Sequence, residues 1–85
     1  MDYALIVFGS VTVANRAKKL MQKQTDYAAV VQLPPDLGIR GCSYCLRIKL
    51  HDFNLMRQTA AQYGIQIKAA FAEGEKDGQK VYESI

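Results

Sequence analysis

The chain has few of the residues that build metal sites and covalent frameworks, with only two cysteines and one histidine in 85 residues. Two cysteines cannot form the disulfide network that stabilises many small secreted domains, and the chain starts without a basic, secretion-type leader. A closed zinc site needs about four ligands, more than these three side chains supply. We therefore expect no metal, no cofactor and a cytoplasmic location, where thiols stay reduced.

Other absences narrow the class of function. The sequence has no run of about 18 apolar residues that could cross a bilayer, no glycine-rich phosphate-binding loop and no obvious pair of catalytic carboxylates. RNA binding on a sheet of the kind predicted below needs stacking aromatics on central strands, and the strand starting at Tyr44 offers only that residue. Neither membrane insertion nor nucleic-acid binding is expected.

The length and the composition indicate one globular domain with one core, since 49% of the residues are hydrophobic and 22% are charged. A domain of this size hides only about 60% of the surface of its unfolded chain, so formation of a homodimer would not be surprising. Much of the net charge of +3 comes from one expected helix, which carries Arg16, Lys18, Lys19 and Lys23. Such a patch can meet an acidic protein or RNA, and a solvated helix face is the simpler interpretation.

Hydrophobic patterning predicts four strands. Residues 3–9 are almost wholly apolar and rich in β-forming residues, residues 27–33 form a second apolar stretch, and residues 65–72 are expected to form a further strand. From Tyr44 to Leu50 apolar and polar residues alternate, which is typical of a strand with one buried and one polar face. Pro34 and Pro35 end the second apolar strand because proline lacks a backbone donor.

Two helices are expected between these strands. Ser10 or Thr12 can cap the first helix, whose apolar residues recur at helical spacing up to about Lys23. Asp52 can cap the second helix, and Gly64 supplies its C-terminal stop. The order strand, helix, strand therefore occurs twice along the chain.

This repeated order predicts an α+β fold, a ferredoxin-like βαββαβ sandwich with two helices on one face of an antiparallel sheet. We expect the domain to occupy residues 1–73, and a polar C-terminal tail with at most a short edge strand to occupy residues 74–85. In such a sheet the end of the first strand, the start of the first helix and the head of the third strand share one rim. Cys42 is therefore expected near Ser10 and Thr12.

Cys42 and Cys45 are the strongest candidates for chemistry, because a thiolate is the only strong nucleophile that the sequence offers. A helix N-terminus and a nearby cation favour the thiolate; Arg40 supplies the cation, and Gly41 permits a tight, exposed approach. Cys45 lies inside the strand on the face opposite to Leu46, where it is either a surface residue or a resolving thiol. The simpler interpretation is that both cysteines are small, buried apolar residues.

The single histidine does not extend this site. His51 lies at the far end of the same strand, roughly 30 Å from Cys42 at the rise of an extended chain, so a Cys/His dyad is excluded. A symmetric dimer could still assemble a four-thiolate metal site from two cysteine pairs.

Several of these residues resemble a known family. The segments that carry the resemblance are Phe8-x-Ser10 before a helix with Ala17-x-x-Leu20, then Leu33-Pro34-Pro35, then Gly41-Cys42 followed by Leu46-Arg47-Ile48. Together they are similar to the small bacterial selenium/sulfur carrier-like domains over about residues 3–72. The resemblance implies that Cys42 carries sulfur or selenium as a persulfide or perselenide, and that Arg47 matches an arginine of the family.

The chain departs from the family pattern at two positions. Ser43 stands where a glycine is expected after the cysteine, which changes the expected loop geometry. Cys45 stands where a small apolar residue is usual, which favours dithiol chemistry in which Cys45 resolves a persulfide or disulfide on Cys42.

We predict a carrier rather than a turnover enzyme, with sulfur or selenium donor and acceptor proteins as its partners. Cys42 and Cys45 carry the chemistry, and the residues expected to bind the anion are Ser10, Thr12, Arg40, Gly41 and Arg47. One alternative is a non-catalytic module with incidental cysteines, which dimerises through the open sheet face and binds an acidic partner through Arg47, Lys49 and Lys68. Another is a CxxC dithiol redox protein.

Overall fold

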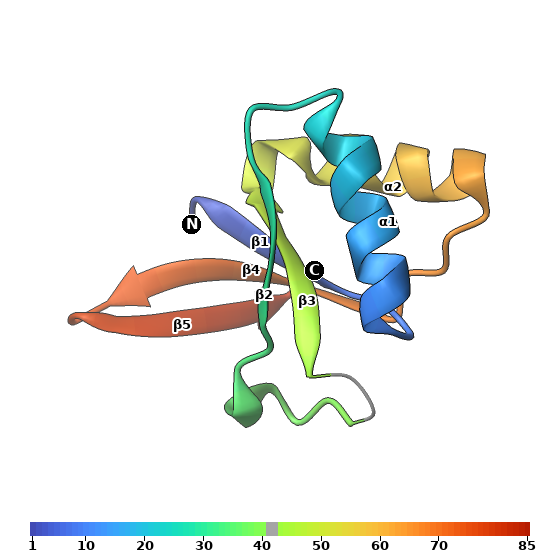
Figure 1. Ribbon diagram of the computed structural model, residues 1–85. Helices are drawn as coiled ribbons and strands as arrows, with labels where there is room; N and C mark the ends of the chain where they lie inside the picture. Colours follow the sequence, from blue (N-terminus) through green and yellow to red (C-terminus); the bar gives the residue numbers. More distant parts are fainter. Residues whose placement is uncertain (41–42) are drawn as a thin grey trace.

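Five strands and two α-helices make up the part of the chain that the computed structural model describes, residues 1–40 and 43–85 (Figure 1). The strands are β1 (Tyr3–Val7), β2 (Ala28–Gln32), β3 (Tyr44–Lys49), β4 (Ala69–Lys76) and β5 (Gln79–Ser84). The helices are α1 (Val11–Gln22) and α2 (Phe53–Tyr63), and short 3-10 turns η1 and η2 occupy Pro35–Leu37 and Leu50–Asp52. Neither helix in these residues is long and apolar enough to span a membrane.

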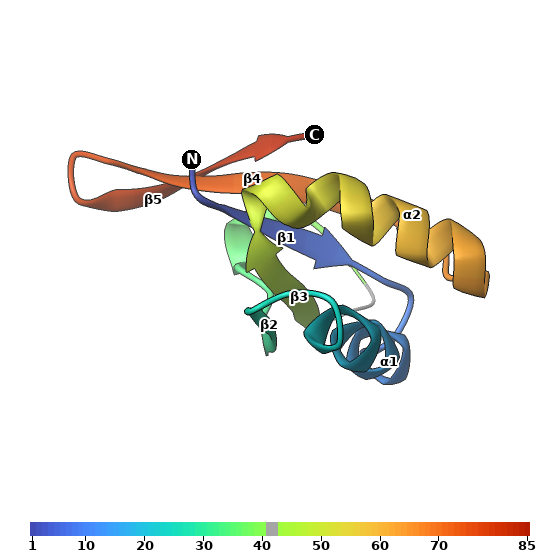
Figure 2. The same ribbon diagram turned by 90° about the horizontal axis from the view of Figure 1, so that it is seen from above.

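The strands form one antiparallel sheet in the order β2-β3-β1-β4-β5. β1 is the central strand, and its Ile6 lies opposite Leu46 of β3 on one side and Ala70 of β4 on the other. Both helices pack on the same face of this sheet, as the view from above shows (Figure 2). Because β1 and β3 are antiparallel, the end of β1 and the head of β3 lie at the same end of the sheet.

The structure contains a fifth strand, β5, which the expected βαββαβ order does not include. β4 continues to Lys76 and turns through Asp77 and Gly78, which have positive φ values of 52° and 77°. β5 then pairs back along β4, with Lys76 opposite Gln79, so the hairpin loop has two residues. Asp-Gly is a strong signal for such a turn, because both residues tolerate a left-handed backbone. Figure 1 shows the hairpin reaching away from the helices.

The start of β4 also differs from the prediction. The apolar segment from Ile65 suggests a strand, yet the ladder with β1 begins only at Ala69, opposite Val7. The Ile65 amide donates to the Ala60 carbonyl across the end of α2, and the buried Ile65 side chain joins the core under the helices. Its apolar character therefore reflects packing of a connection rather than strand pairing.

The helix ends follow the local signals in part. Ser10 is the N-cap of α1, and its hydroxyl oxygen accepts a hydrogen bond from the Val13 amide at 3.2 Å. Gly64 ends α2 in the left-handed conformation. Asp52 stands at the N-cap position of α2, but its side chain makes no capping hydrogen bond and lies 3.5 Å from His51 Nε2. The prediction of Asp52 as a capping side chain is therefore wrong.

The core has two parts, one on each face of the sheet. Under the helices, β1 and β3 contribute large apolar side chains, and α1 contributes Ala14, Ala17 and Met21, all fully buried. The other face holds a smaller cluster of Leu5, Val7 and Cys45. Its covering side chains come from the 33–39 loop and from β2, β4 and β5, and include Leu33, Leu37, Ile39, Phe71 and Tyr82. The sheet face opposite the helices is therefore covered at this end.

Replacement of Gly64 by alanine tests the left-handed helix end. Gly64 has φ of +66°, so an L side chain is strained there although no atom lies within 4 Å of the added Cβ. We expect Gly64→Ala to lower the free energy of unfolding by about 1 kcal/mol. Gly9→Ala is the matched control, since its Cβ also meets nothing within 4 Å and its φ is not positive. Equal losses in the two variants, measured by urea denaturation, would contradict this account of α2.

Candidate functional site

The predicted site centres on residues that flank the head of β3. Cys42 and Gly41 lie outside the described residues. On the N-terminal side, exposed Arg40 follows a left-handed Gly38 at the end of η1. On the C-terminal side, the Ser43 carbonyl accepts a hydrogen bond from the Leu33 amide at 2.8 Å, which extends the pairing of β2 with β3. Ser43, at the head of β3, is thus hydrogen-bonded to the residue that follows β2.

Ser10 and Thr12 occupy the start of α1, which follows directly after the end of β1. That end of the sheet is also where β3 begins, so the shared rim exists among the described residues. The Ser10 hydroxyl already caps the helix, whereas Thr12 is exposed in the first turn. Their proximity to Cys42 and Arg40 stays a prediction.

A hollow lies beside the head of β3. It has a volume of about 390 Å³, and its lining combines apolar side chains with two polar ones: Gln32, Leu33, Pro34, Pro35, Ile39 and Ser43. Ser43 is the chain neighbour of Cys42, so the hollow adjoins the predicted site. Its apolar walls suit a side chain or short segment of a protein partner.

Cys45 is fully buried, which excludes its interpretation as a surface residue. Strand alternation correctly places it on the face opposite to Leu46, but this face is covered by Leu37, Ile39 and Tyr82. Burial also raises the pKa of the Tyr82 phenol, with the negative charge of Glu73 as a second cause. Cys45 therefore packs as a small apolar residue, and a resolving role would require this packing to open.

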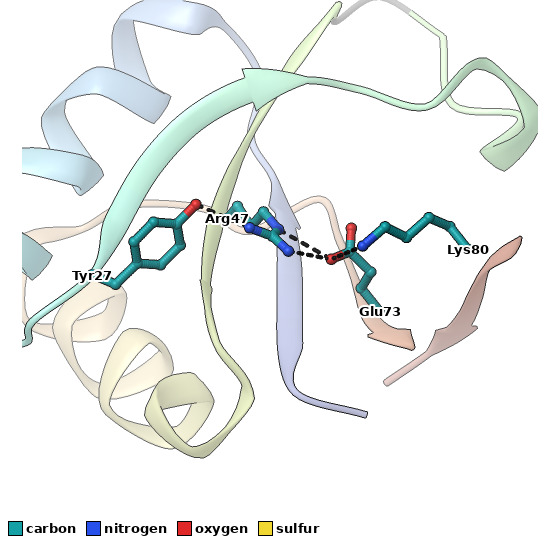
Figure 3. A network of polar contacts seen from close by, with 4 residues as sticks. All are labelled: Tyr27, Arg47, Glu73 and Lys80. Atoms are coloured by element: carbon teal, nitrogen blue, oxygen red, sulfur yellow. Dashed lines mark hydrogen bonds and ion pairs between the residues drawn. The ribbon is translucent and has the colours of Figure 1, made fainter. Parts of the chain in front are cut away.

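Arg47 is the centre of a polar network farther along the same face (Figure 3). Its Nε and Nη2 donate to Glu73 Oε2 at 3.0 and 2.7 Å, and its Nη1 donates to the Tyr27 hydroxyl at 3.2 Å. The guanidinium carbon lies 3.6 Å from the centre of the Tyr3 ring, an arrangement that adds a cation–π attraction. Lys80 approaches the same Glu73 oxygen at 3.7 Å.

Arg47, which the sequence analysis assigns to anion binding, already has partners in this network. Burial lowers the pKa of Arg47, but the hydrogen bonds to Glu73 and Tyr27 outweigh it and leave the pKa raised. The guanidinium thus has an anionic partner within the chain, and an external anion would have to compete with Glu73. Sequence reasoning missed Glu73 because it placed this residue in a polar turn; its spacing of two from Phe71 is the signal that puts it on this face.

Arg47, Lys49 and Lys68, which were expected to bind an acidic partner together, do not form one surface. Lys49 Nζ lies 2.9 Å from Asp26 Oδ2, and this contact raises the pKa of Lys49 and lowers that of Asp26. Lys68 precedes β4, donates its backbone amide to the Val7 carbonyl, and lines a hollow beside the start of α1. The charges of Arg47 and Lys49 are therefore balanced within the chain, and Lys68 lies apart from them.

The arrangement of possible metal ligands can be checked in the described part of the chain. Among residues 1–40 and 43–85, no group of three or more histidine, cysteine, aspartate or glutamate side chains could hold a metal ion.

Comparison with family models finds a match over most of the chain. A family model described as "Putative Se/S carrier protein-like" matches residues 2–72, which include Cys42 and Arg47. Comparison with curated proteins and with solved structures gives no match. The match ends within β4, so Glu73 and all of β5 lie beyond it.

Arg47→Ala tests the network on the face opposite the helices. Glu73 has only 8% of its side chain exposed and Arg47 22%, so removal of the guanidinium leaves a nearly buried carboxylate without its main partner. We expect a loss of about 2–3 kcal/mol in the free energy of unfolding. Lys80→Ala, which removes an exposed cation from the same carboxylate, should cost less than about 1 kcal/mol. Denaturant unfolding of both variants measures the difference, and equal costs would refute the central role of Arg47.

Thiol alkylation tests the burial of Cys45. In a Cys42→Ser variant, the remaining Cys45 thiol should react with iodoacetamide only when the protein opens, because its side chain is covered on all sides. Mass spectrometry should show slow labelling in buffer and complete labelling in denaturant. Rapid labelling of this variant in its folded state would contradict the packing of Cys45.

Proposed function

The chain belongs to the family of Se/S carrier-like proteins, and from this membership we propose that it carries sulfur or selenium on Cys42. The Cys42 thiolate attacks the terminal sulfur of a donor persulfide. A new sulfur–sulfur bond forms on Cys42, and the donor cysteine leaves as a thiolate with the electron pair of the broken bond. The persulfide then passes to an acceptor protein by the same kind of exchange, and selenium follows the equivalent route as a perselenide.

The observation that carries the proposal is the family match, which spans Cys42. Two features of the described residues support it. Arg40 is exposed two positions before Cys42, where a cation favours a thiolate or persulfide anion. Cys45, the other thiol, is fully buried and therefore poorly placed to meet a donor protein.

A protein partner fits the surroundings of the head of β3. Tyr44 is 43% exposed there, and tyrosine is enriched at protein interfaces. The hollow lined by Leu33, Pro34 and Ile39 also has Ser43, the residue before Tyr44, in its lining. We propose that donor and acceptor proteins dock over this region in turn, in the cytoplasm, where thiols stay reduced.

The fold supplies a rigid base for this loop. We propose that residues 1–73 form a ferredoxin-like sandwich, in which β1 to β4 and the two helices are the common elements and β5 is an added edge strand. The strand order β2-β3-β1-β4 and the placement of both helices on one face support this assignment. Ser43, which follows Cys42 in the chain, would then stand at the end of a sheet whose central strand pairs on both sides.

Intact-mass analysis after incubation with a cysteine desulfurase and cysteine tests the carrier. The wild-type chain should gain the mass of one sulfur atom, and a reductant should remove it. Cys42→Ser should gain none. Cys45→Ala is the matched control: it keeps the proposed carrier thiol, avoids placing a hydroxyl in the apolar cluster, and should load like the wild type.

Two outcomes would change the assignment. Equal loading of the wild type and Cys42→Ser would refute Cys42 as the carrier. Longer survival of the persulfide in Cys45→Ala than in the wild type would show that Cys45 resolves it, in favour of a dithiol cycle.

A further inference from the structure

A second hollow lies between the start of α1 and the connection from α2 to β4, away from the Arg47 network. It has a volume of about 370 Å³, and its lining comes from the end of β1, the first turns of α1 and the connection from α2 to β4: Gly9, Val13, Arg16, Gly64, Ile65, Gln66 and Lys68. In both ribbon views the start of α1 and this connection lie on the same side of the molecule (Figures 1 and 2). The lining thus joins segments about fifty residues apart in the sequence.

The charge of this hollow is unbalanced. Arg16 and Lys68 line it, and none of its lining residues in the described part of the chain is an aspartate or glutamate. Neither α1 nor α2 contains an aspartate or glutamate, so the helices that flank the hollow add no negative side chain. Arg47 and Lys49 each contact a carboxylate within the chain, and Arg16 and Lys68 differ from them in this respect.

One side-chain contact and one backbone contact position the two cationic residues, both of which are exposed. Arg16 Nη2 donates to the Tyr63 carbonyl at 3.4 Å, at the C-terminal end of α2. A guanidinium has five N–H donors, so this contact leaves donors for a ligand. The Lys68 backbone amide donates to the Val7 carbonyl at 2.8 Å, which fixes the Lys68 backbone against the end of β1.

The remaining lining residues set the size and polarity of the hollow. Gly9 contributes no side chain, and a Cβ there would meet no atom within 4 Å, so this wall is open. Val13 and Ile65 supply apolar surface, and Gln66 supplies an amide that can donate or accept. The volume is at the low end of the range for small-molecule sites. Two cations, one amide and a short apolar wall suit a small, negatively charged compound.

We propose that this hollow binds the oxyanionic group, phosphate or carboxylate, of a small molecule. Arg16 and Lys68 donate charge-assisted hydrogen bonds to its oxygens, and these bonds are stronger than those between neutral groups. The site does not use Cys42, and it stands independently of the carrier function. The hollow lies at the end of the sheet where β1 ends and β3 begins, so a small anionic molecule bound there shares an end of the domain with the head of β3.

Titration with inorganic phosphate, followed by ¹H–¹⁵N NMR at constant ionic strength, tests the proposal on the full chain. We expect saturable shifts of the Gly9, Gln66 and Lys68 amides, with a dissociation constant of about 1 mM or lower. A parallel titration with acetate separates the two sources of an oxyanion: shifts with phosphate alone assign a phosphate group, and shifts with acetate at the same amides assign a carboxylate. Linear shifts without saturation in both titrations would overturn the proposal.

Charge-removal variants separate a site from general attraction. Arg16→Gln and Lys68→Gln should each weaken binding about tenfold, which corresponds to the loss of about 1.4 kcal/mol. Lys23→Gln removes an exposed cation at the end of α1, outside the hollow, and should bind like the wild type. Cys42→Ser should also bind like the wild type, so failure of sulfur loading does not affect this result. Equal weakening by Lys23→Gln and Arg16→Gln, in spectra that show folded proteins, would refute a specific site.

Discussion

The burial of Ala4 to Val7 in β1 is the constraint on which the rest of the structure depends. Residues Ala4 to Val7 point alternately to both faces of the sheet, and each has at most 1% of its surface exposed. A central strand with apolar side chains on both faces needs two covers, and the two α-helices among the described residues both lie on one face. The second cover comes from the 33–39 loop and the β4–β5 hairpin, whose side chains pack over Leu5 and Val7. The burial of Cys45 follows, because it lies beside these residues on the same face.

How much the sequence predicts depends on whether the signal is local. Ser10 caps α1 and Gly64 ends α2 through backbone groups a few residues away, and both are readable from the chain. Cys45 and Glu73 are different: their surroundings come from remote segments, so alternation identifies the face but not what covers it. The Asp77-Gly78 turn is a local signal for the fifth strand, outweighed by the polar composition around it. For the candidate site, the sequence predicts Cys42, which lies within the span of the family match. The hollow beside the start of α1, by contrast, becomes evident only when Arg16 and Lys68 are brought together.

The polar network explains how the face opposite the helices changes from apolar to charged over one strand. From Cys45 to Arg47 along β3, the neighbours change from Leu5 and Val7 to Tyr3, Tyr27 and Glu73. A nearly buried carboxylate is costly unless it is paired and hydrogen-bonded. Arg47 pairs it with two donors, and the aromatic rings screen the guanidinium from water while they interact with its charge. This arrangement ties β3 to β4 across β1, so side chains as well as backbone join the three central strands.

The family match ends at residue 72, so the Arg47 network joins residues inside the match to residues beyond it. Arg47 lies inside the matched region, but its carboxylate partner is the first residue beyond it, and Lys80 and Tyr82 lie farther on in the hairpin. In this chain the hairpin therefore neutralises a cation of the family domain and covers the apolar cluster beside it. A domain without a carboxylate at this place would have to pair the arginine differently or expose it to an anionic ligand. The charge of the face opposite the helices is thus set by the C-terminal hairpin, whereas the cysteine loop and the cationic hollow are built from residues that all lie inside the matched domain.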